Sequence, residues 1–377
     1  MSKTLQDYAT LINDTIQSNE INHYITTDNM CQNLGGIDTF KNINIPQGKV
    51  RSFQKDDILL SNIRLYFRKV YRAKQKGGCS SDVLVFRAKH IDSATLFAIL
   101  SSQIFTDYAC SGSQGSKMPR GNKTHMMDFK IPTINFTIAK IFNSIQNKIE
   151  NNHKINELLH KILELLYEQY FVRFDFLDEN NKPYQTSGGK MKFSKELNRL
   201  IPSGWSVRFL NHKIVSTYQP KTISKTLLNN SYSYSVYGGG GIIGRFTEYN
   251  HEQSEFIISC RGQCGISYLT LPKSWITGNA MVIRPTKSYT SKTYLYHTIK
   301  KYKLTNYITG SVQPQITRQN LSTMPILIPK RKILNKWNNI SSLLWNLIHN
   351  NMQATQTLTA IRDFLLPLLL KQQVKPK

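Results

Sequence analysis

The organisation of the chain is decided by the stretch Asp57-Ile-Leu-Leu-Ser61 and its counterpart Glu255-Phe-Ile-Ile-Ser259. Each stretch places an acidic residue before three apolar residues and a serine, at an offset of 255 − 57 = 198 positions. Further matches keep nearly this offset: Gly112-Ser113 with Gly310-Ser311, Arg120-Gly-Asn122 with Arg318-Gln-Asn320, and, after one residue of slippage, Ile131-Pro132 with Ile328-Pro329. Because the matches recur in the same order, the sequence predicts an internal duplication.

A long helical stretch follows each copy. Apolar residues recur there at alternating steps of four and three, which is the pattern of a coiled-coil seam. In the second copy the seam positions are Ile333, Trp337, Ile340, Leu344, Leu347, Asn351, Ala354, Leu358, Ile361, Leu365 and Leu368. In the first copy they are Ile134, Ile138, Ile141, Ile145, Lys148, Asn152, Ile155, Leu159, Ile162 and Leu166. The seam of the first copy is poorer, because Lys148 interrupts it.

Two asparagines, Asn152 and Asn351, occupy equivalent positions of the two predicted seams. A buried Asn–Asn pair costs stability but fixes the register and orientation of a coiled coil. The alternative is a solvated mid-helix in each copy, since Asn-rich runs surround both residues. We expect these two residues to set the helix register.

The predicted fold class is α/β, with two mixed α/β copies and two long helices. Short β-rich runs such as Val83–Phe86 and Ala280–Ile283 are punctuated by Gly, Pro and Asn. The expected segments are a first globular domain over 1–135, a first helix over 136–172, a linker over 173–195, a second globular domain over 196–330 and a second helix over 331–372.

The composition indicates a polyanionic partner. The 377 residues include 49 Lys and Arg against 23 Asp and Glu, a net charge of +26. No apolar run approaches the ~20 residues of a membrane helix, and the N-terminus has no apolar signal region. The five cysteines are odd in number and form no CxxC pair, which is typical of a reducing cytosol. We expect a cytoplasmic protein that binds nucleic acid rather than a membrane.

The sequence lacks the motifs of covalent catalysis. Gly238-Gly-Gly-Gly241 has no Gly-Lys-Ser/Thr ending and is better explained as a flexible turn than as a phosphate loop. Asp128-Phe-Lys130 has no second carboxylate close upstream that would help it to hold a metal ion. The histidines form no HExxH pattern, and no serine nucleophile elbow occurs. We therefore expect neither catalysis nor a metal site in this chain.

Basic and amide side chains gather in each copy at positions suited to DNA. In the first copy the candidates are Arg64, Arg68, Lys69, Arg72, Ser113, Lys117, Arg120 and Asn122. In the second copy they are Arg245, Arg261, Gln263, Gln313, Gln315, Arg318 and Asn320. Arginine pairs with guanine, and Asn or Gln with adenine, through two hydrogen bonds, while cations and loop amides position phosphates. The alternative is that these cations only keep the protein soluble.

Longer stretches of the chain resemble the specificity subunit of type I restriction–modification systems. The resemblance rests on Val236-Tyr-Gly-Gly-Gly-Gly-Ile-Ile-Gly244, Ile257-Ile-Ser-Cys-Arg-Gly-Gln-Cys-Gly265, Gln315-Ile-Thr-Arg-Gln-Asn-Leu321 with Pro325-Ile-Leu-Ile-Pro329, Tyr167-Glu-Gln-Tyr-Phe-Val-Arg-Phe-Asp-Phe176 and Leu200-Ile-Pro-Ser-Gly-Trp205. It covers essentially the whole chain and is stronger in the second copy, since the first lacks the Gly-rich stretch and the Trp opening.

The resemblance implies two target-recognition domains separated by two antiparallel helices, with an internal pseudo-two-fold repeat. It implies that the chain reads a bipartite site on double-stranded DNA, together with two modification subunits and, for cleavage, restriction subunits. S-adenosylmethionine, ATP and magnesium would then belong to those partners, and this chain would bind no cofactor. The alternative is a basic coiled-coil scaffold that binds RNA or acidic lipid without sequence preference.

Overall fold

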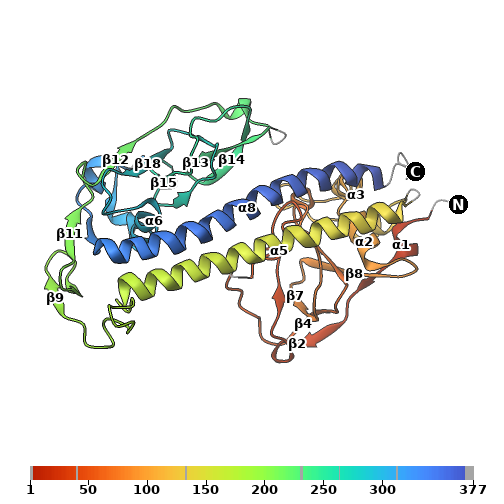
Figure 1. Ribbon diagram of the computed structural model, residues 1–377. Coiled ribbons are helices and arrows are strands. Elements are labelled where there is room, and N and C mark those ends of the chain that lie inside the picture. The colour runs from red at the N-terminus through yellow and green to blue at the C-terminus, as the bar shows by residue number, and fades with distance from the viewer. Residues whose placement is uncertain are drawn as a thin grey trace. The chain divides into compact units, whose positions relative to one another are not determined.

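The computed structural model describes residues 3–39, 41–131, 134–229, 232–262, 264–310 and 313–369 (Figure 1). The chain forms two compact units. Unit 1 comprises Met1–Lys154 and Asn351–Lys377, and unit 2 comprises Ile155–Asn350. Each unit therefore holds its own sheets together with one part of each of two long helices.

Unit 1 is built on two four-stranded sheets, in the orders β1-β8-β5-β6 and β2-β4-β7-β3. The strands are β1 (Ala9–Ile12), β2 (Thr15–Gln17), β3 (Tyr24–Ile25), β4 (Lys49–Phe53), β5 (Ile58–Ser61), β6 (Val70–Arg72), β7 (Gly77–Cys79) and β8 (Val83–Ala88). The helices are α1 (Leu5–Tyr8), α2 (Ser93–Leu100), α3 (Gln103–Ser111), α4 (Lys123–Met127) and the first part of α5 (Phe136–Tyr167), with 3₁₀ turns η1 (Ser18–Glu20) and η2 (Leu65–Phe67).

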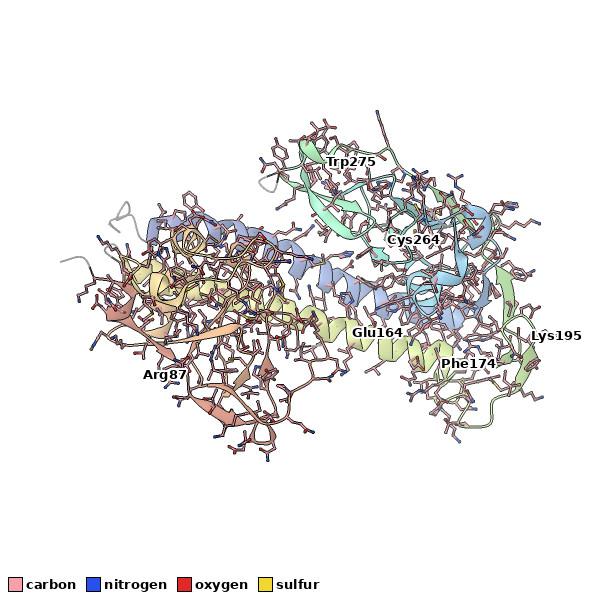
Figure 2. All side chains as sticks on the ribbon, turned by 180° about the vertical axis from the view of Figure 1, so that it is seen from behind. Arg87, Glu164, Phe174, Lys195, Cys264 and Trp275 are labelled. Atoms are coloured by element: carbon pink, nitrogen blue, oxygen red, sulfur yellow. The ribbon has the colours of Figure 1, made fainter. Side chains whose placement is uncertain are left out.

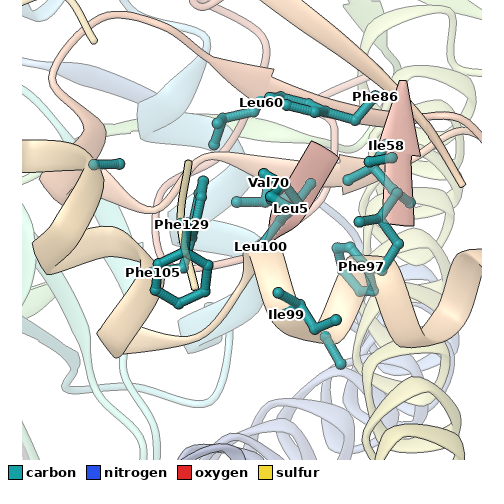
Figure 3. Close-up of a cluster of buried hydrophobic side chains, with 14 of the residues drawn as sticks. Leu5, Ile58, Leu60, Val70, Phe86, Phe97, Ile99, Leu100, Phe105 and Phe129 are labelled. Atoms are coloured by element: carbon teal, nitrogen blue, oxygen red, sulfur yellow. The ribbon is translucent and has the colours of Figure 1, made fainter. Parts of the chain in front are cut away.

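A hydrophobic core lies between the first sheet of unit 1 and helices α2, α3 and α5 (Figure 3). Ile58 and Phe86 come from the sheet, Phe97 from α2 and Phe105 from α3, and none is more than 1% exposed. Helix α2 is buried on all sides from Thr95 to Leu100, as expected for a helix that is apolar all round. Because burial of a Leu or Phe side chain contributes about 2 kcal/mol, this core holds the helices against the sheet.

Unit 2 contains a four-stranded sheet of order β12-β18-β15-β16 and a three-stranded sheet of order β14-β13-β17. Their strands are β12 (Val215–Tyr218), β13 (Tyr234–Gly238), β14 (Gly241–Phe246), β15 (Phe256–Ser259), β16 (Ser267–Leu269), β17 (Trp275–Ile276) and β18 (Ala280–Pro285). Two-stranded sheets pair β9 (Met191–Ser194) with β10 (Arg199–Pro202), β11 (Ser206–Phe209) with β21 (Pro325–Ile328), and β19 (Ile308–Thr309) with β20 (Gln315–Ile316). The helical elements are η3 (Glu168–Val172), η4 (Lys225–Leu227), α6 (Lys292–Lys300), η5 (Leu304–Tyr307), α7 (Arg318–Leu321) and the first part of α8 (Arg331–Leu369).

The two units share the register of their central strands. In unit 1, Ile58 of β5 faces Phe86 of β8, and in unit 2, Phe256 of β15 faces Ile283 of β18. The offsets are 256 − 58 = 198 and 283 − 86 = 197, close to those found in the sequence. Both units combine helices with mainly antiparallel sheets, and each unit has one parallel strand pair, which confirms the mixed α/β fold class.

An ion pair between a buried carboxylate and a partly exposed arginine occupies the same place in both sheets. The carboxylate of Asp57, 2% exposed, accepts two hydrogen bonds from Arg87, each 2.8 Å long (Figure 2). In unit 2 the Glu255 carboxylate, 9% exposed, accepts from Arg284 at 2.7 Å. Hydrogen bonding to the carboxylate raises the pKa of each arginine. The acidic residue of the repeated stretch thus anchors the neighbouring strand in each unit.

In unit 1 the first part of α5 pairs with the last part of α8. Arg362 donates to the side-chain oxygen of Gln146 at 3.1 Å, and Asn152 Nδ2 donates to Thr355 Oγ1 at 3.1 Å. Since the contact on α8 moves backward as α5 advances, the two segments are antiparallel. Arg362 is only 1% exposed, so a charged residue lies inside this helix pair.

In unit 2 the last part of α5 pairs with the first part of α8. Asn156 Nδ2 donates to the carbonyl of Ile348 at 3.3 Å, and the rings of Tyr167 and Trp337 lie 5.8 Å apart. This pairing is also antiparallel. Helix α5 continues directly into the π-helical turn η3, where Phe171 joins the buried aromatic cluster.

The predicted seam is wrong by one residue in one of its two columns. On α5 the inward column consists of Phe142, Ile149 and Leu163, which are buried, and Asn156, which is half-buried. The predicted residues Ile141, Ile155 and Ile162 are instead 43–44% exposed. Lys148, which interrupted the predicted seam, is exposed, and Ile149 is buried beside it. On α8, Ser341, Ile348 and Arg362 are buried, while Ile340, Leu347 and Ile361 are 37–44% exposed. The apolar pattern of the sequence did not identify this buried column of α8, because the column includes the polar residues Ser341 and Arg362.

A search of the described residues found no helix long and apolar enough to cross a membrane.

Candidate nucleic-acid interface

The basic stretch after β5 forms a turn that is fastened to the loop over 111–124. Arg64 precedes the 3₁₀ turn η2 and is half-buried. Its backbone N–H donates to the carbonyl of Pro119 at 2.9 Å, and its guanidinium donates to that of Lys117 at 3.3 Å. Arg64 therefore holds two candidate segments together.

Three further candidates of this stretch are used inside unit 1. Arg68 donates to the carbonyl of Ser101 at 2.9 Å, and Lys69 donates to that of Thr27 at 2.5 Å. Burial lowers the pKa of both side chains. Arg72 pairs with Asp56 at 2.8 Å and also donates to Asn143 of α5. The structure gives these three cations partners within the protein.

The loop over 111–124 carries the exposed candidates of unit 1. Lys117 is exposed, and Arg120, 63% exposed, lies 3.0 Å from Asp82. Asn122 is exposed and caps α4 by accepting a hydrogen bond from the backbone of His125. Ser113 Oγ donates to the carbonyl of Ala109 and closes the end of α3. The loop contains three cations and no acidic residue.

In unit 2 the turn after β15 is joined to the strand β20. Arg261 and Gln315 form an antiparallel bridge, and the backbone N–H of Ile316 donates to the carbonyl of Cys260 at 3.0 Å. Cys264, labelled in Figure 2, donates its thiol to the carbonyl of Pro314 at 3.1 Å. Two candidates that lie 54 positions apart in the sequence are thereby brought side by side.

The other candidates of unit 2 take different places. Gln313 and Arg318 are exposed, and Arg318 is the first residue of α7. Asn320 is half-buried, with Nδ2 donating to the carbonyl of Tyr307 at 3.1 Å. Arg245 is half-buried in β14 and donates to the carbonyl of Ser233. Gln263 lies outside the described residues.

The glycine-rich stretch forms the β13–β14 hairpin beside Arg261. A Cβ on Gly239 would lie 3.1 Å from the carbonyl oxygen of Arg261, while Gly240 faces open space. Gly241 has φ +102 and would place a Cβ 3.3 Å from the Tyr268 hydroxyl. The glycines therefore allow the hairpin to approach the turn after β15 closely.

The bridges correct one match made in the sequence. In unit 1, Arg120 bridges Ile63, and in unit 2, Gln315 bridges Arg261. Ile63 and Arg261 differ by 198 positions, so the structural counterpart of Arg120 is Gln315, at an offset of 195, rather than Arg318. The helix caps agree, because Asn122 caps α4 and Thr317 caps α7, again 195 positions apart.

The predicted register asparagines both lie in unit 1. Asn152 is 1% exposed and donates to Thr355, which lies one turn of α8 beyond Asn351. Asn351 is half-buried. The buried polar contact at this level of the helix pair is thus an Asn–Thr hydrogen bond.

Sequence reasoning missed two exposed apolar residues of unit 1. Tyr66, in η2, and Met118, in the loop over 111–124, are each 53% exposed. A basic stretch with interleaved aromatics was the available signal, but it does not show which ring faces outward.

One cavity of unit 2 lies away from these loops. It has a volume of about 450 Å³ and is lined by Tyr167, Arg199, Lys301 and Tyr302, among others, and by none of the candidates. Among the described residues, no group of three His, Cys, Asp or Glu side chains could hold a metal ion. The arrangement consists of cations, amides and loop backbone, which suits binding of a polyanion.

Three comparisons bear on this arrangement. The family described as the type I restriction modification DNA specificity domain matches residues 202–358. The type I restriction enzyme MjaIX specificity subunit of Methanocaldococcus jannaschii is 21% identical over 311 residues, which cover 73% of this chain and 67% of that protein. The crystal structure of the type I restriction–modification system S subunit from M. genitalium superposes with a TM-score of 0.62 at 15% identity, covering 99% of this chain and 96% of that one.

Proposed function

We propose that the chain is a specificity subunit of a type I restriction–modification system, since residues 202–358 match the type I restriction modification DNA specificity domain. We further propose that its two units contain two target-recognition domains, each reading one half of a bipartite site on double-stranded DNA. The role of the chain is DNA sequence recognition and not catalysis. The proposed domains are the predicted ones, over 1–135 and 196–330, with the helical segments over 136–172 and 331–372 acting as spacers and 173–195 as a linker.

The observation that carries the proposal is the pair of matching loop junctions. Each unit joins the turn after its central strand to a distant loop through one bridge, Ile63 to Arg120 or Arg261 to Gln315. Guanidinium and amide groups are the side chains that read guanine and adenine through paired hydrogen bonds. We propose that the exposed members read bases or phosphates and that Arg68, Lys69 and Arg72 position the turn that presents them.

The long helices are proposed to form an antiparallel coiled coil and to dock the partner subunits. On α5 in unit 2 the exposed residues Ile155, Leu158, Ile162 and Leu165 recur at steps of three and four. Such a stripe on a helix already paired along another face is suited to a further helix. We propose two modification subunits, related by an internal pseudo-two-fold repeat, with restriction subunits added for cleavage.

The chemistry would belong to those partners. S-adenosylmethionine would be bound by the modification subunits, and ATP and magnesium by the restriction subunits, in the cytoplasm. This chain would recognise the target sequence on DNA, and its long helices would hold the subunits together.

The test is a salt series on duplex DNA with the purified chain bound to its modification subunits. Phosphate contacts release counterions, so the logarithm of the binding constant should fall linearly with the logarithm of salt concentration. A duplex carrying the target should retain an advantage of about a thousandfold or more over a scrambled one. Binding that ignored both salt and sequence would reject the proposal, and salt-dependent binding without sequence preference would favour the scaffold alternative.

A further inference from the structure

Two exposed apolar side chains stand among the cations of unit 1. Tyr66 and Met118 are each 53% exposed, although both are large and apolar. Their segments are joined by Arg64, whose backbone N–H donates to Pro119 and whose guanidinium donates to Lys117. The two hydrogen bonds of Arg64 therefore join the segments that carry the Tyr66 ring and the Met118 thioether, which lie 52 positions apart in the sequence.

The turn η2, which carries Tyr66, is held by backbone hydrogen bonds. The turn η2 lies between Arg64 and Arg68, which have φ of 50° and 49°. Asn33 donates to the carbonyl of Phe67 at 2.9 Å, and Leu34 donates to that of Arg68 at 3.1 Å. A positive φ is found at both residues that flank the turn, Arg64 and Arg68, and at both residues that donate to it, Asn33 and Leu34. Left-handed backbone costs energy at non-glycine residues and collects at functional sites.

The charge around this pair fits DNA. Lys117 and Arg120 lie on the same loop as Met118, and the loop over 111–124 has no acidic residue. Cations hold the phosphates at the edge of a groove, while apolar side chains contact the C5-methyl group of thymine, the apolar group in the major groove.

Unit 2 lacks such a pair at the corresponding places. By the offset of 195 set by the bridges and caps of this loop, Met118 corresponds to Gln313, which is exposed. By the offset of 198, Tyr66 corresponds to Cys264, whose thiol bonds to Pro314. At these two positions unit 2 therefore has an exposed amide and a hydrogen-bonded thiol in place of the thioether and the ring of unit 1.

We propose that Tyr66 and Met118 are specificity residues of unit 1, which contact thymine methyl groups in the half-site that this unit reads. The inference rests on the proposed function, since it assumes that the loops of unit 1 enter a DNA groove. It adds the chemistry of recognition, namely an apolar contact in one half-site.

The experiment uses the full chain with its modification subunits and duplexes in which each thymine of the target is replaced singly by deoxyuridine. Deoxyuridine pairs like thymine and lacks only the methyl group. For the wild type, replacement in one half-site should weaken binding about fourfold for each recognised methyl group that is removed. The variant Tyr66→Ala/Met118→Ala should bind the thymine duplex more weakly and should not discriminate between thymine and deoxyuridine.

Two control variants separate this effect from others. Lys117→Ala removes a cation from the same loop, so it should lower the salt dependence and keep the deoxyuridine effect. Phe193→Ala removes a ring that is 59% exposed in unit 2 and should leave both unchanged. Thermal unfolding checks that the double variant is folded.

The inference is overturned if the wild type shows no deoxyuridine effect in either half-site, or if the double variant keeps the wild-type effect. In both cases the wild type would still prefer its target over a scrambled duplex. Loss of that preference in the wild type would instead reject the proposed function.

Discussion

Unit 1 and unit 2 have the same central sheet and different edges. The strand orders β1-β8-β5-β6 and β12-β18-β15-β16 are equivalent, and so are the ion pairs Asp57–Arg87 and Glu255–Arg284. At the bridged loops, Ile63 and Arg120 of unit 1 stand where unit 2 has Arg261 and Gln315. The comparison shows that the strand order and the ion pair of the central sheet are the same in both units, whereas the side chains of the exposed bridged loops differ.

The interiors of the units also differ in their histidines and tryptophans. In unit 2, His297 and His349 are 3% and 8% exposed, whereas no histidine described in unit 1 is as buried. All four tryptophans lie in unit 2, at 205, 275, 337 and 345. Tryptophan fluorescence therefore reports on unit 2, and hydrogen exchange is needed to follow unit 1.

The largest expected effect is a selective loss of stability of unit 2 in mild acid. Burial lowers the pKa of His297 to about 3 and that of His349 to about 4. Both pKa values lie below the unfolded value, so the unfolded state binds more protons and stability falls as pH drops below about 6.5. Between pH 6.5 and 5 the two residues together should cost about 3 kcal/mol. Denaturant unfolding followed by tryptophan fluorescence measures this loss.

A matched variant tests the cause. His297→Phe keeps a ring against Tyr167, whose centroid lies 5.5 Å away, and removes one titrating group. It should reduce the pH dependence of unit 2 without abolishing it, because burial also lowers the pKa of His349, His251 and His160 in the same unit. An unchanged slope, or an equal acid loss in the hydrogen exchange of unit 1, would contradict the assignment.

The next prediction tests whether the ion pairs Asp57–Arg87 and Glu255–Arg284 stabilise their units equally. Arg87→Ala leaves the carboxylate of Asp57 buried without its arginine, and Arg284→Ala does the same to Glu255. Removing one partner of a fully buried pair costs about 3 kcal/mol. Here the loss should be nearer ~2 kcal/mol, because Arg87 and Arg284 are 35% and 48% exposed and water screens the pair. Asp57 is the less exposed, at 2% against 9%, so unit 1 should lose slightly more. Protection of β5 and β15 in hydrogen exchange measures each loss, and a loss under about 0.5 kcal/mol in either unit would break the equivalence.

The smallest effect concerns the edges and is a reciprocal exchange. Arg120→Gln and Gln315→Arg give each unit the side chain that its counterpart has. Arg favours guanine and Gln favours adenine by about 1–3 kcal/mol, so each variant should change preference at one base pair of its own half-site. Selection from randomised duplexes measures the change. A variant that altered both half-sites, or left both unaltered, would oppose modular reading.

The sequence predicted the fold class, both long helices and the offset of the central strands. It placed one seam column wrongly because the helices carry two apolar stripes. Ile155 and Ile162 belong to the exposed stripe and Leu163 to the buried one, and periodicity alone does not tell which stripe meets the neighbouring helix. Only the contacts between α5 and α8 within each unit separate the two.

The candidate site was predicted less completely. Residue type identified Arg120, Arg261 and Gln315, but the pairing of Arg120 with Arg318 missed a three-residue difference between the loops. That difference becomes visible through the bridges and helix caps. Residue type also did not show that Arg68 and Arg72 donate to partners inside unit 1, because such partners come from distant parts of the chain.

The most direct test of two reading domains on one spacer is a map of methylated adenines in the genome of a host carrying this chain and its modification subunits. The account predicts one bipartite motif, with two short specified elements separated by a gap of fixed length. A single contiguous motif, or methylation without sequence preference, would contradict it.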